Sequence, residues 1–365
     1  MPAPAGKAMA PYFMSNTESL PSFNLRNIML PVLIGFGISA YLLWSNFNPG
    51  ALASIPFTAH LWIGLALAAL TVLLRDLAYM WRIKVITGDK LSWYKSFEVI
   101  MLWEFGSAIT PGAVGGIALA LFILKKENIS YGRSTATIML TTFLDNLSFV
   151  IVFAAMYWWL GKGMFLVSTD CPDVAGNVVL KGISSLADKS VIGWMLYAGS
   201  AAFFALSLFV FPKQAKGFFY NVSHFSCLQR WSKSIQHIGD EIEITSSEFV
   251  KMPYLFFVKM MAATLIAWLS RYLLANALFF AFSEVSLNQI EVLARQYVLW
   301  VFVVIPSTPG AAGLAELSFV AMNCAFIPTG LAATVAIIWR AYSYYLYLLV
   351  GAVVFPKWLL RVSKN

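Results

Sequence analysis

The phrase Ile-Thr-Pro-Gly-Ala-Val-Gly at residues 109–115 returns as Ser-Thr-Pro-Gly-Ala-Ala-Gly at residues 307–313 of this 365-residue chain. Each copy interrupts an apolar segment, the first at 97–124 and the second at 292–325. Proline and glycine disfavour a continuous helix. Each interrupted segment is therefore predicted to be either a kinked crossing of a membrane or a re-entrant hairpin that enters and leaves on one side.

The sequence around these phrases is that of a polytopic membrane protein. Hydrophobic residues make up 60% of the chain and charged residues 12%, whereas soluble domains average about 25% charged. The apolar residues form blocks of the length that an α-helix needs to cross about 30 Å of hydrocarbon. Six uninterrupted blocks are predicted to span the membrane, at 28–47, 58–80, 134–160, 190–211, 253–282 and 331–354.

The distribution of Lys and Arg favours re-entrant hairpins over kinked crossings. Cytoplasmic loops carry an excess of Lys and Arg. With both interrupted segments re-entrant, 17 of the 25 basic residues lie in the cytoplasm and three lie outside. With both as full crossings, the split is 12 to eight. Each half of a hairpin has about 14 residues, roughly 21 Å of helix, which is too short to span a bilayer.

The two phrases belong to two copies of one larger unit. An offset of 198 residues pairs Thr110 with Thr308 and extends without a gap to Gly132 and Gly330. Each copy is predicted to contain two helices, a re-entrant hairpin and a third helix, and the charge pattern gives the copies opposite orientations. Inverted repeats are typical of transporters that alternate access around a site near the midplane.

Thr-Pro-Gly is suited to the start of a helix. Thr accepts a backbone N–H as N-cap, and Pro fits the first helical position. Two such helix starts facing the midplane would favour an anion. The alternative is that Pro and Gly only bend the chain for close packing. The predicted anion-binding residues are Thr110, Pro111, Gly112, Thr308, Pro309 and Gly310.

Ionisable residues within the apolar segments are the second set of candidates, because charges in a membrane are costly and mark function. Arginine grips phosphate with a planar fork. The arginines expected to contact substrate are Arg75, Arg271 and Arg340. The acids expected to shape or couple the site are Glu104, Asp145 and Glu316. The alternative is internal pairing, for instance of Arg340 with Glu316.

Other classes of function find little support in the residues. The net charge of +8 is attributed to cytoplasmic loops, so no nucleic-acid partner is expected. The three cysteines and three histidines show no metal-ligand or disulfide spacing. We therefore expect no catalytic residues, no metal, no cofactor and no enzymatic activity. A homo-oligomer is left open.

The motifs resemble the transmembrane flippase domain of lysylphosphatidylglycerol synthase. Its pattern P-x-x-P-G-x-x-G-x-x-E is similar to Pro-Ser-Thr-Pro-Gly-Ala-Ala-Gly-Leu-Ala-Glu at 306–316, followed by Arg340 and a Tyr-rich helix. In the first copy, Thr110 to Gly115 and Asp145 also match. About ten residues follow Phe355, so the aminoacyl-transferase domain of the two-part enzymes is expected to be missing. The resemblance implies translocation of a lipid with a phosphate-bearing headgroup.

The sequence thus predicts an all-α membrane protein with six spanning helices and two re-entrant hairpins in an inverted repeat. Its parts are an N-terminal cytoplasmic segment at 1–27, a first repeat at 28–160, an external loop at 161–189, a second repeat at 190–354 containing a cytoplasmic loop at 212–252, and a cytoplasmic tail at 355–365.

The predicted function is a flippase of the bacterial inner membrane, acting on a phospholipid or a polyprenyl-phosphate lipid by alternating access. Its N- and C-termini are expected to be cytoplasmic. Two alternatives stay open, a secondary transporter of a small organic or inorganic anion and a non-transporting scaffold subunit.

Overall fold

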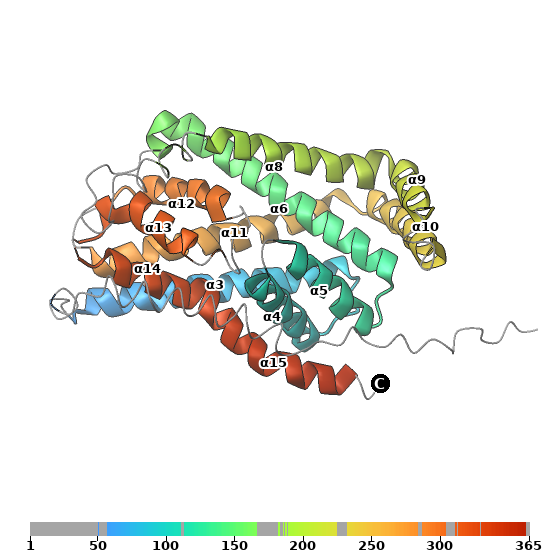
Figure 1. Ribbon diagram of the computed structural model, residues 1–365, viewed down its shortest axis with the longest axis horizontal. Coiled ribbons are helices and arrows are strands. Elements are labelled where there is room, and N and C mark those ends of the chain that lie inside the picture. Colours follow the sequence, from blue (N-terminus) through green and yellow to red (C-terminus); the bar gives the residue numbers. More distant parts are fainter. Residues whose placement is uncertain are drawn as a thin grey trace, which may run out of the picture.

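A computed structural model describes residues 57–110, 113–165, 189–224, 232–283, 287–303, 313–328 and 330–362, with single positions at 50, 182, 185, 187 and 311. Within these ranges the chain is helical, with short connecting turns and no strand (Figure 1). The helices are α3 (Ala59–Ile86), α4 (Trp93–Ile109), α5 (Ala113–Lys126), α6 (Tyr131–Leu160), α8 (Ser190–Ala205), α9 (Pro212–Ser223), α10 (Ser232–Val250), α11 (Tyr254–Phe282), α12 (Gln289–Val303), α13 (Leu314–Asn323), α14 (Ala332–Arg340) and α15 (Leu346–Val362).

Five helical stretches are long and apolar enough to cross a membrane. They are Ala59–Ile86, Tyr131–Phe165, Ser190–Val210, Tyr254–Phe282 and Ala332–Val362. Each overlaps one of the predicted spans. The sixth predicted span, 28–47, and the segment at 1–27 lie outside the described residues. The all-α membrane fold predicted from hydropathy is confirmed.

Two of these stretches continue through a π-helical turn. Leu206–Val210 extends α8, and Ala341–Tyr345 joins α14 to α15. Single π turns inside α-helices are rare and frequent at functional sites. The second π turn follows Arg340 directly, in the Tyr-rich stretch singled out from the sequence.

The interrupted segments form two pairs of short helices. Helices α4 and α5 have 17 and 14 residues. A Cβ on Gly106 would lie 2.7 Å from Leu119, and a Cβ on Gly116 would lie 2.0 Å from Ser107. The two glycines therefore permit close antiparallel packing. Helices α12 and α13, of 15 and 10 residues, are joined by the Arg295 guanidinium, which donates to the Met322 carbonyl at 2.6 Å.

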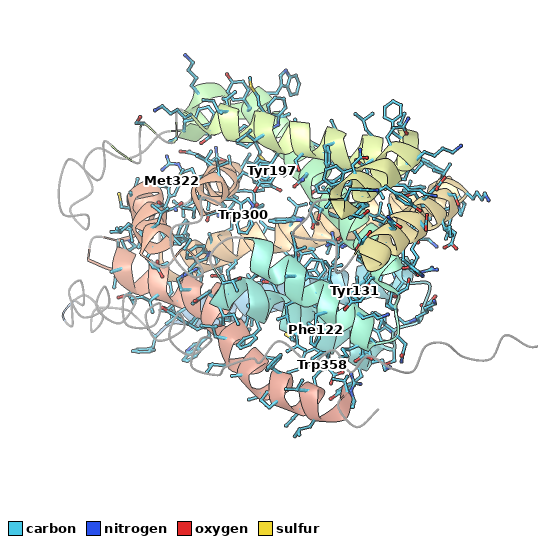
Figure 2. The ribbon with its side chains drawn as sticks, turned by 45° about the vertical axis from the view of Figure 1, so that its right-hand side comes forward. Phe122, Tyr131, Tyr197, Trp300, Met322 and Trp358 are labelled. Carbon is cyan, nitrogen blue, oxygen red and sulfur yellow. The ribbon has the colours of Figure 1, made fainter. Side chains whose placement is uncertain are left out.

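The base of the first hairpin is fixed to α15. Phe122 of α5 and Trp358 of α15 lie together, with ring centroids 5.9 Å apart (Figure 2). The Trp358 indole donates to Glu127 Oε1 at 3.0 Å. Arg361 pairs with Glu98 at 2.8 Å and also with Glu127. Buried carboxylates need such partners, so these contacts tie both ends of the hairpin to the last helix.

The centre of the molecule is the antiparallel pair of α3 and α11. A Cβ on Gly64 would lie 2.4 Å from the Cβ of Ala281, so the helix backbones approach closely there. This register brings Arg75, further along α3, opposite Arg271 on α11. Helix α3 continues to Ile86, six residues beyond the predicted span. Arg82, which sequence analysis placed in a cytoplasmic loop, therefore belongs to the helix and is buried.

The loop predicted at 212–252 contains two packed helices, α9 and α10. Helices α9 and α10 stack at one end of the long helices (Figure 1). Lys216 pairs with Asp240 at 2.8 Å and with Glu243 at 3.0 Å. The Gly132 amide donates to Glu241 Oε2 at 2.8 Å, which fixes α10 to the start of α6.

The expectation that the cysteines form no disulfide is wrong. Cys324, which follows α13, is disulfide-bonded. The other two cysteines of the chain, Cys171 and Cys227, lie outside the described residues. Sequence spacing did not reveal this bond because Cys171 and Cys227 are both far from Cys324 along the chain.

Candidate functional site

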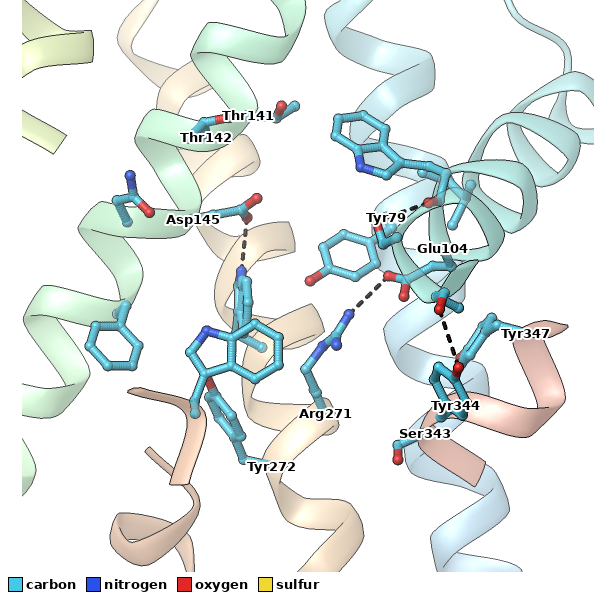
Figure 3. A pocket seen from close by; sticks show the side chains of 18 of the residues that line it. Tyr79, Glu104, Thr141, Thr142, Asp145, Arg271, Tyr272, Ser343, Tyr344 and Tyr347 are labelled. Atoms are coloured by element: carbon cyan, nitrogen blue, oxygen red, sulfur yellow. Dashed lines mark hydrogen bonds and ion pairs between the residues drawn. The ribbon is translucent and has the colours of Figure 1, made fainter. Parts of the chain in front are cut away.

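A cavity of about 670 Å³ lies among the long helices and the two hairpins. Charged side chains from α3, α4, α6, α11 and α14 line it, namely Arg82, Glu104, Asp145, Arg271 and Arg340. Aromatic side chains cover much of the remaining wall, among them Trp103, Trp268, Trp300, Tyr272 and Tyr344. Figure 3 shows Asp145 joined by a dashed line to an indole nitrogen and Arg271 joined by another to Glu104.

Glu104 joins two arginines, Arg75 and Arg271, which lie 196 residues apart, close to the 198-residue offset of the repeat. Arg75 Nη2 lies 2.6 Å from Glu104 Oε1, and Arg271 Nη2 lies 2.9 Å from the same oxygen. Three residues of the predicted site thus meet at one carboxylate oxygen (Figure 3 shows Arg271 and Glu104). Pairing offsets the cost of removing these charges from water.

Arg75 stands behind the cavity wall. Its side chain is 2% exposed, and its guanidinium lies 4.4 Å from the ring centroid of Tyr347. Asp76 Oδ1 is 3.5 Å from Arg75 Nε, and the Tyr347 hydroxyl donates to Asp76 at 3.0 Å. Arg75 therefore holds Glu104 from the protein side, while the cavity lies on the other side.

Arg271 faces the cavity. Its side chain is 17% exposed, and its guanidinium lies 5.2 Å from the ring centroids of both Trp268 and Trp300. Indole faces attract a guanidinium through the ring quadrupole. Arg271 Nε has no hydrogen-bond partner among the described residues. One donor of a cavity-facing arginine is thus left unused.

Asp145 forms a separate charged group with Arg82. Both terminal nitrogens of Arg82 contact the Asp145 carboxylate, and Arg82 Nη1 also donates to Thr264 Oγ1 at 3.0 Å. The Trp268 indole donates to Asp145 Oδ1 at 2.8 Å. Asp145 therefore orients the same indole that packs on Arg271.

Arg82 is the functional candidate that sequence analysis missed. Its neighbours Trp81 and Lys84 lower the local hydropathy, so the predicted span ended at residue 80. A signal was present in the spacing, because Arg75, Tyr79 and Arg82 follow one another at four and three residues, which is one face of a helix. All three are buried on α3.

Glu316 and Arg340 form the internal pair that was one of the two alternatives. Arg340 Nε lies 2.8 Å from Glu316 Oε1, and their side chains are 5% and 7% exposed. The Glu316 carboxylate also accepts from the Gly313 amide at 2.7 Å. The Arg340 guanidinium lies 4.2 Å from the ring centroid of Tyr344. Arg340 lines the cavity, but its charge is matched within the second hairpin.

The predicted helix starts need correction. Thr110 is the C-cap of α4 and its hydroxyl donates to the Gly106 carbonyl at 2.7 Å, while α5 begins only at Ala113. Thr110 therefore closes one helix and does not open the next.

In the second copy, α13 begins at Leu314 with Gly313 as its N-cap, in a left-handed conformation at φ 88° that suits glycine. The remaining predicted residues of the two phrases, Pro111, Gly112, Thr308, Pro309 and Gly310, lie outside the described residues.

The cavity reaches the apolar surface of the protein along α8. Leu196 lines the cavity and is 70% exposed. Its neighbours on the same helix, Ile192, Met195 and Phe203, are also exposed. An exposed apolar face of this kind is suited to contact with the hydrocarbon of a membrane. The charged side chains of the cavity wall therefore lie close to an exposed apolar helix face.

Comparison with known proteins finds similarity over most of the chain. The family model described as the lysylphosphatidylglycerol synthase TM region matches residues 32–351. A UPF0104 membrane protein from Archaeoglobus fulgidus is 20% identical over 330 residues, which cover 89% of this chain and 95% of that protein.

Proposed function

The chain belongs to the lysylphosphatidylglycerol synthase TM region family, and on this premise we propose that it moves a lipid with an anionic, phosphate-bearing headgroup between membrane leaflets by alternating access. The observation that carries the proposal is Arg271, an arginine on a long apolar helix that lines a cavity and is 17% exposed. A charge within a membrane segment is expensive and marks a substrate path, and arginine suits phosphate.

The paired charges around the cavity favour a mechanism in which an arginine exchanges one anionic partner for another. They are less suited to a permanent anion-binding site. Arg75, Arg82, Arg271 and Arg340 each contact a carboxylate. A headgroup that enters this cavity competes with Glu104 for Arg271, which lines the cavity. The lipid tails stay in hydrocarbon beside Leu196, where the cavity wall meets the exposed apolar face of α8.

The proposal includes the inverted topology predicted from the sequence, in which both short-helix hairpins are re-entrant and both termini are cytoplasmic in a bacterial inner membrane. The Cys324 disulfide supports it, since disulfides persist in oxidising compartments and the topology places the end of α13 outside. Peptide mapping under non-reducing conditions tests it. A bond to Cys171, in the predicted external loop, is expected; a bond to Cys227, in the predicted cytoplasmic loop, contradicts the topology.

A secondary transporter of small anions is the second candidate, because Arg271 and Arg340 suit any compact oxyanion. The exposure of Leu196 favours the lipid, since a soluble anion needs a path closed to hydrocarbon. A cavity of about 670 Å³ with charged walls counts against a scaffold without transport.

Reconstituted vesicles separate the candidates. Phosphatidylglycerol carrying a fluorescent group on its tail is chemically quenched from the outer leaflet, and the remaining signal reports exchange between leaflets. We expect the protein to accelerate exchange, Arg271→Gln to abolish the acceleration, and Lys216→Gln, on the distant α9, to preserve it. Flux of inorganic phosphate without lipid exchange would instead identify the small-anion transporter, and the absence of both would contradict transport.

A further inference from the structure

Arg75 and Arg271 meet at one oxygen of Glu104, and their surroundings differ. Their Nη2 atoms lie 2.6 Å and 2.9 Å from Glu104 Oε1. One carboxylate oxygen therefore carries two guanidinium groups, and the loss of either arginine leaves the acid with a partner.

We propose that Arg271 exchanges partners during transport, binding Glu104 when the cavity is empty and the lipid phosphate when it is loaded, while Arg75 holds Glu104 in both states. This inference rests on the function proposed above and assigns distinct roles to the two arginines. Glu104 is then an internal competitor of the substrate.

Exposure separates the exchanging arginine from the fixed one. Arg271 is 17% exposed, Glu104 is 20% exposed, and both line the cavity. Arg75 is 2% exposed and lies against Tyr347 and Asp76. A headgroup that enters the cavity reaches Arg271 and Glu104 before any part of Arg75.

The donor pattern of Arg271 is suited to a second acceptor. Nη2 is used by Glu104, whereas Nε is buried and, like Arg75 Nε, has no hydrogen-bond partner among the described residues; what distinguishes Arg271 from Arg75 is its place on the cavity wall. A phosphate binds two nitrogens of a guanidinium side by side. Trp268 and Trp300, each 5.2 Å from the guanidinium, keep Arg271 in place through contacts that do not depend on which anion it binds.

The exchange leaves no charge in the interior without a partner. An uncompensated buried charge is strongly destabilising. In the empty state Glu104 contacts both arginines, and in the loaded state Arg75 retains Glu104 while the phosphate pairs with Arg271. Pairing of every charge in both states requires Arg75, which explains why a buried arginine lies behind the wall of the cavity.

The proposal predicts opposite effects from two variants of one cluster. Glu104→Gln removes the competing charge, so phosphate binding should tighten, on the order of tenfold for one charge-assisted contact. Arg75→Gln leaves Arg271 as the sole partner of Glu104, so binding should weaken by a similar factor. The double variant Arg75→Gln/Glu104→Gln should recover binding lost in Arg75→Gln, because the carboxylate that needed a partner is gone.

Binding is measured on the purified full chain by native mass spectrometry, with phosphatidylglycerol in mixed micelles as one probe and inorganic phosphate as the other. Thermal unfolding of each variant is recorded in parallel, so that a change in folding is recognised. A merely structural cluster would weaken binding in both single variants, because each removes a contact.

The outcomes separate this inference from the proposed function. Tighter phosphatidylglycerol binding by Glu104→Gln supports the exchange. Unchanged or weaker binding by a folded Glu104→Gln overturns the exchange and leaves the flippase proposal standing. If the Glu104→Gln effect occurs with inorganic phosphate and phosphatidylglycerol does not bind, the exchange holds and the lipid function falls. If neither probe binds, both fall.

Discussion

The two hairpins use their acidic residues in opposite ways. In the first hairpin, Glu104 lies on α4, faces the cavity and is 20% exposed. In the second, Glu316 lies at the start of α13, is 7% exposed, and is held by Arg340 and the Gly313 amide. The first acid is accessible to a substrate and the second is enclosed. The repeat therefore supplies one hairpin whose acid faces the cavity and one whose acid is enclosed.

The 198-residue offset shows which residues stand at the equivalent positions of the two copies. Ala118 and Thr142 stand in the first copy where Glu316 and Arg340 stand in the second. Phe302 occupies the second-copy position of Glu104. Both members of the Glu316–Arg340 pair are thus missing from the first copy. Each hairpin lacks an acid at the position where the other hairpin has one. The acidic side chains around the cavity are therefore placed asymmetrically.

The Glu316–Arg340 pair is expected to give the largest loss of stability. Arg340→Ala leaves the buried Glu316 carboxylate without its guanidinium, which should cost about 3–5 kcal/mol of unfolding free energy. Thermal unfolding in detergent measures the loss. The double variant Arg340→Met/Glu316→Gln, which removes both charges, should recover much of it. A stable Arg340→Ala protein would contradict this role of the pair.

The exchanging arginine is expected to affect transport far more than stability. Arg271→Gln leaves Glu104 paired with Arg75 at 2.6 Å, so unfolding should change by no more than about 1 kcal/mol, in the range of one hydrogen bond. Lipid exchange should fall at least about tenfold with loss of this charge-assisted contact. The vesicle assay and thermal unfolding, run on one preparation, test both parts. Equal losses in stability for Arg271→Gln and Arg340→Ala would contradict the proposed difference between the accessible Glu104 cluster and the enclosed Glu316–Arg340 pair.

The indole beneath Arg271 gives a smaller, graded test. Trp268→Phe keeps an aromatic face but removes the hydrogen bond to Asp145 at 2.8 Å. We expect about 1 kcal/mol of destabilisation and a partial loss of lipid exchange, because Asp145 keeps Arg82 while the ring under Arg271 loses its anchor. Trp339→Phe, on the wall nearer the second hairpin, is the matched control and should retain exchange.

The smallest effect is expected outside the membrane, on α9 and α10. The hydrogen bond from Lys216 holds the pKa of Asp240 below its usual value. A lowered acid pKa stabilises the folded state above the ordinary pKa of about 3.9, and this contribution is lost as pH falls through the lowered value. Hydrogen exchange along α10 should therefore rise in this acidic window. Lys216→Gln should reduce this dependence of hydrogen exchange on pH. An unchanged profile would show that the Lys216–Asp240 ion pair does not contribute to the stability of α9 and α10.

The sequence predicts the helices well because hydrophobic length is a strong local signal. All five described spans overlap predicted ones, and the duplicated phrase located both pairs of short helices. Helix ends were less predictable. Arg82 was placed in a loop because charged neighbours mask the last turns of α3, and Thr110 was assigned to the wrong helix because an N-cap and a C-cap both suit threonine.

Side-chain partners were the least predictable feature. Glu104 and Arg271 are 167 residues apart, and composition does not specify which face of a helix meets which neighbour. Arg340 and Glu316 were recognised as a candidate pair because they lie on consecutive helices. The shared contact of Arg75 and Arg271 emerged only once α3 and α11 were aligned, since it depends on the close approach at Gly64.

The most direct test of the account is lipid analysis of the purified protein. Mass spectrometry should find a phosphate-headed lipid retained by the unmodified chain and by Lys216→Gln, and lost from Arg271→Gln at equal thermal stability. The same lipid retained equally by Arg271→Gln, or a bound lipid without phosphate, would contradict the claim that Arg271 in this cavity binds a lipid headgroup.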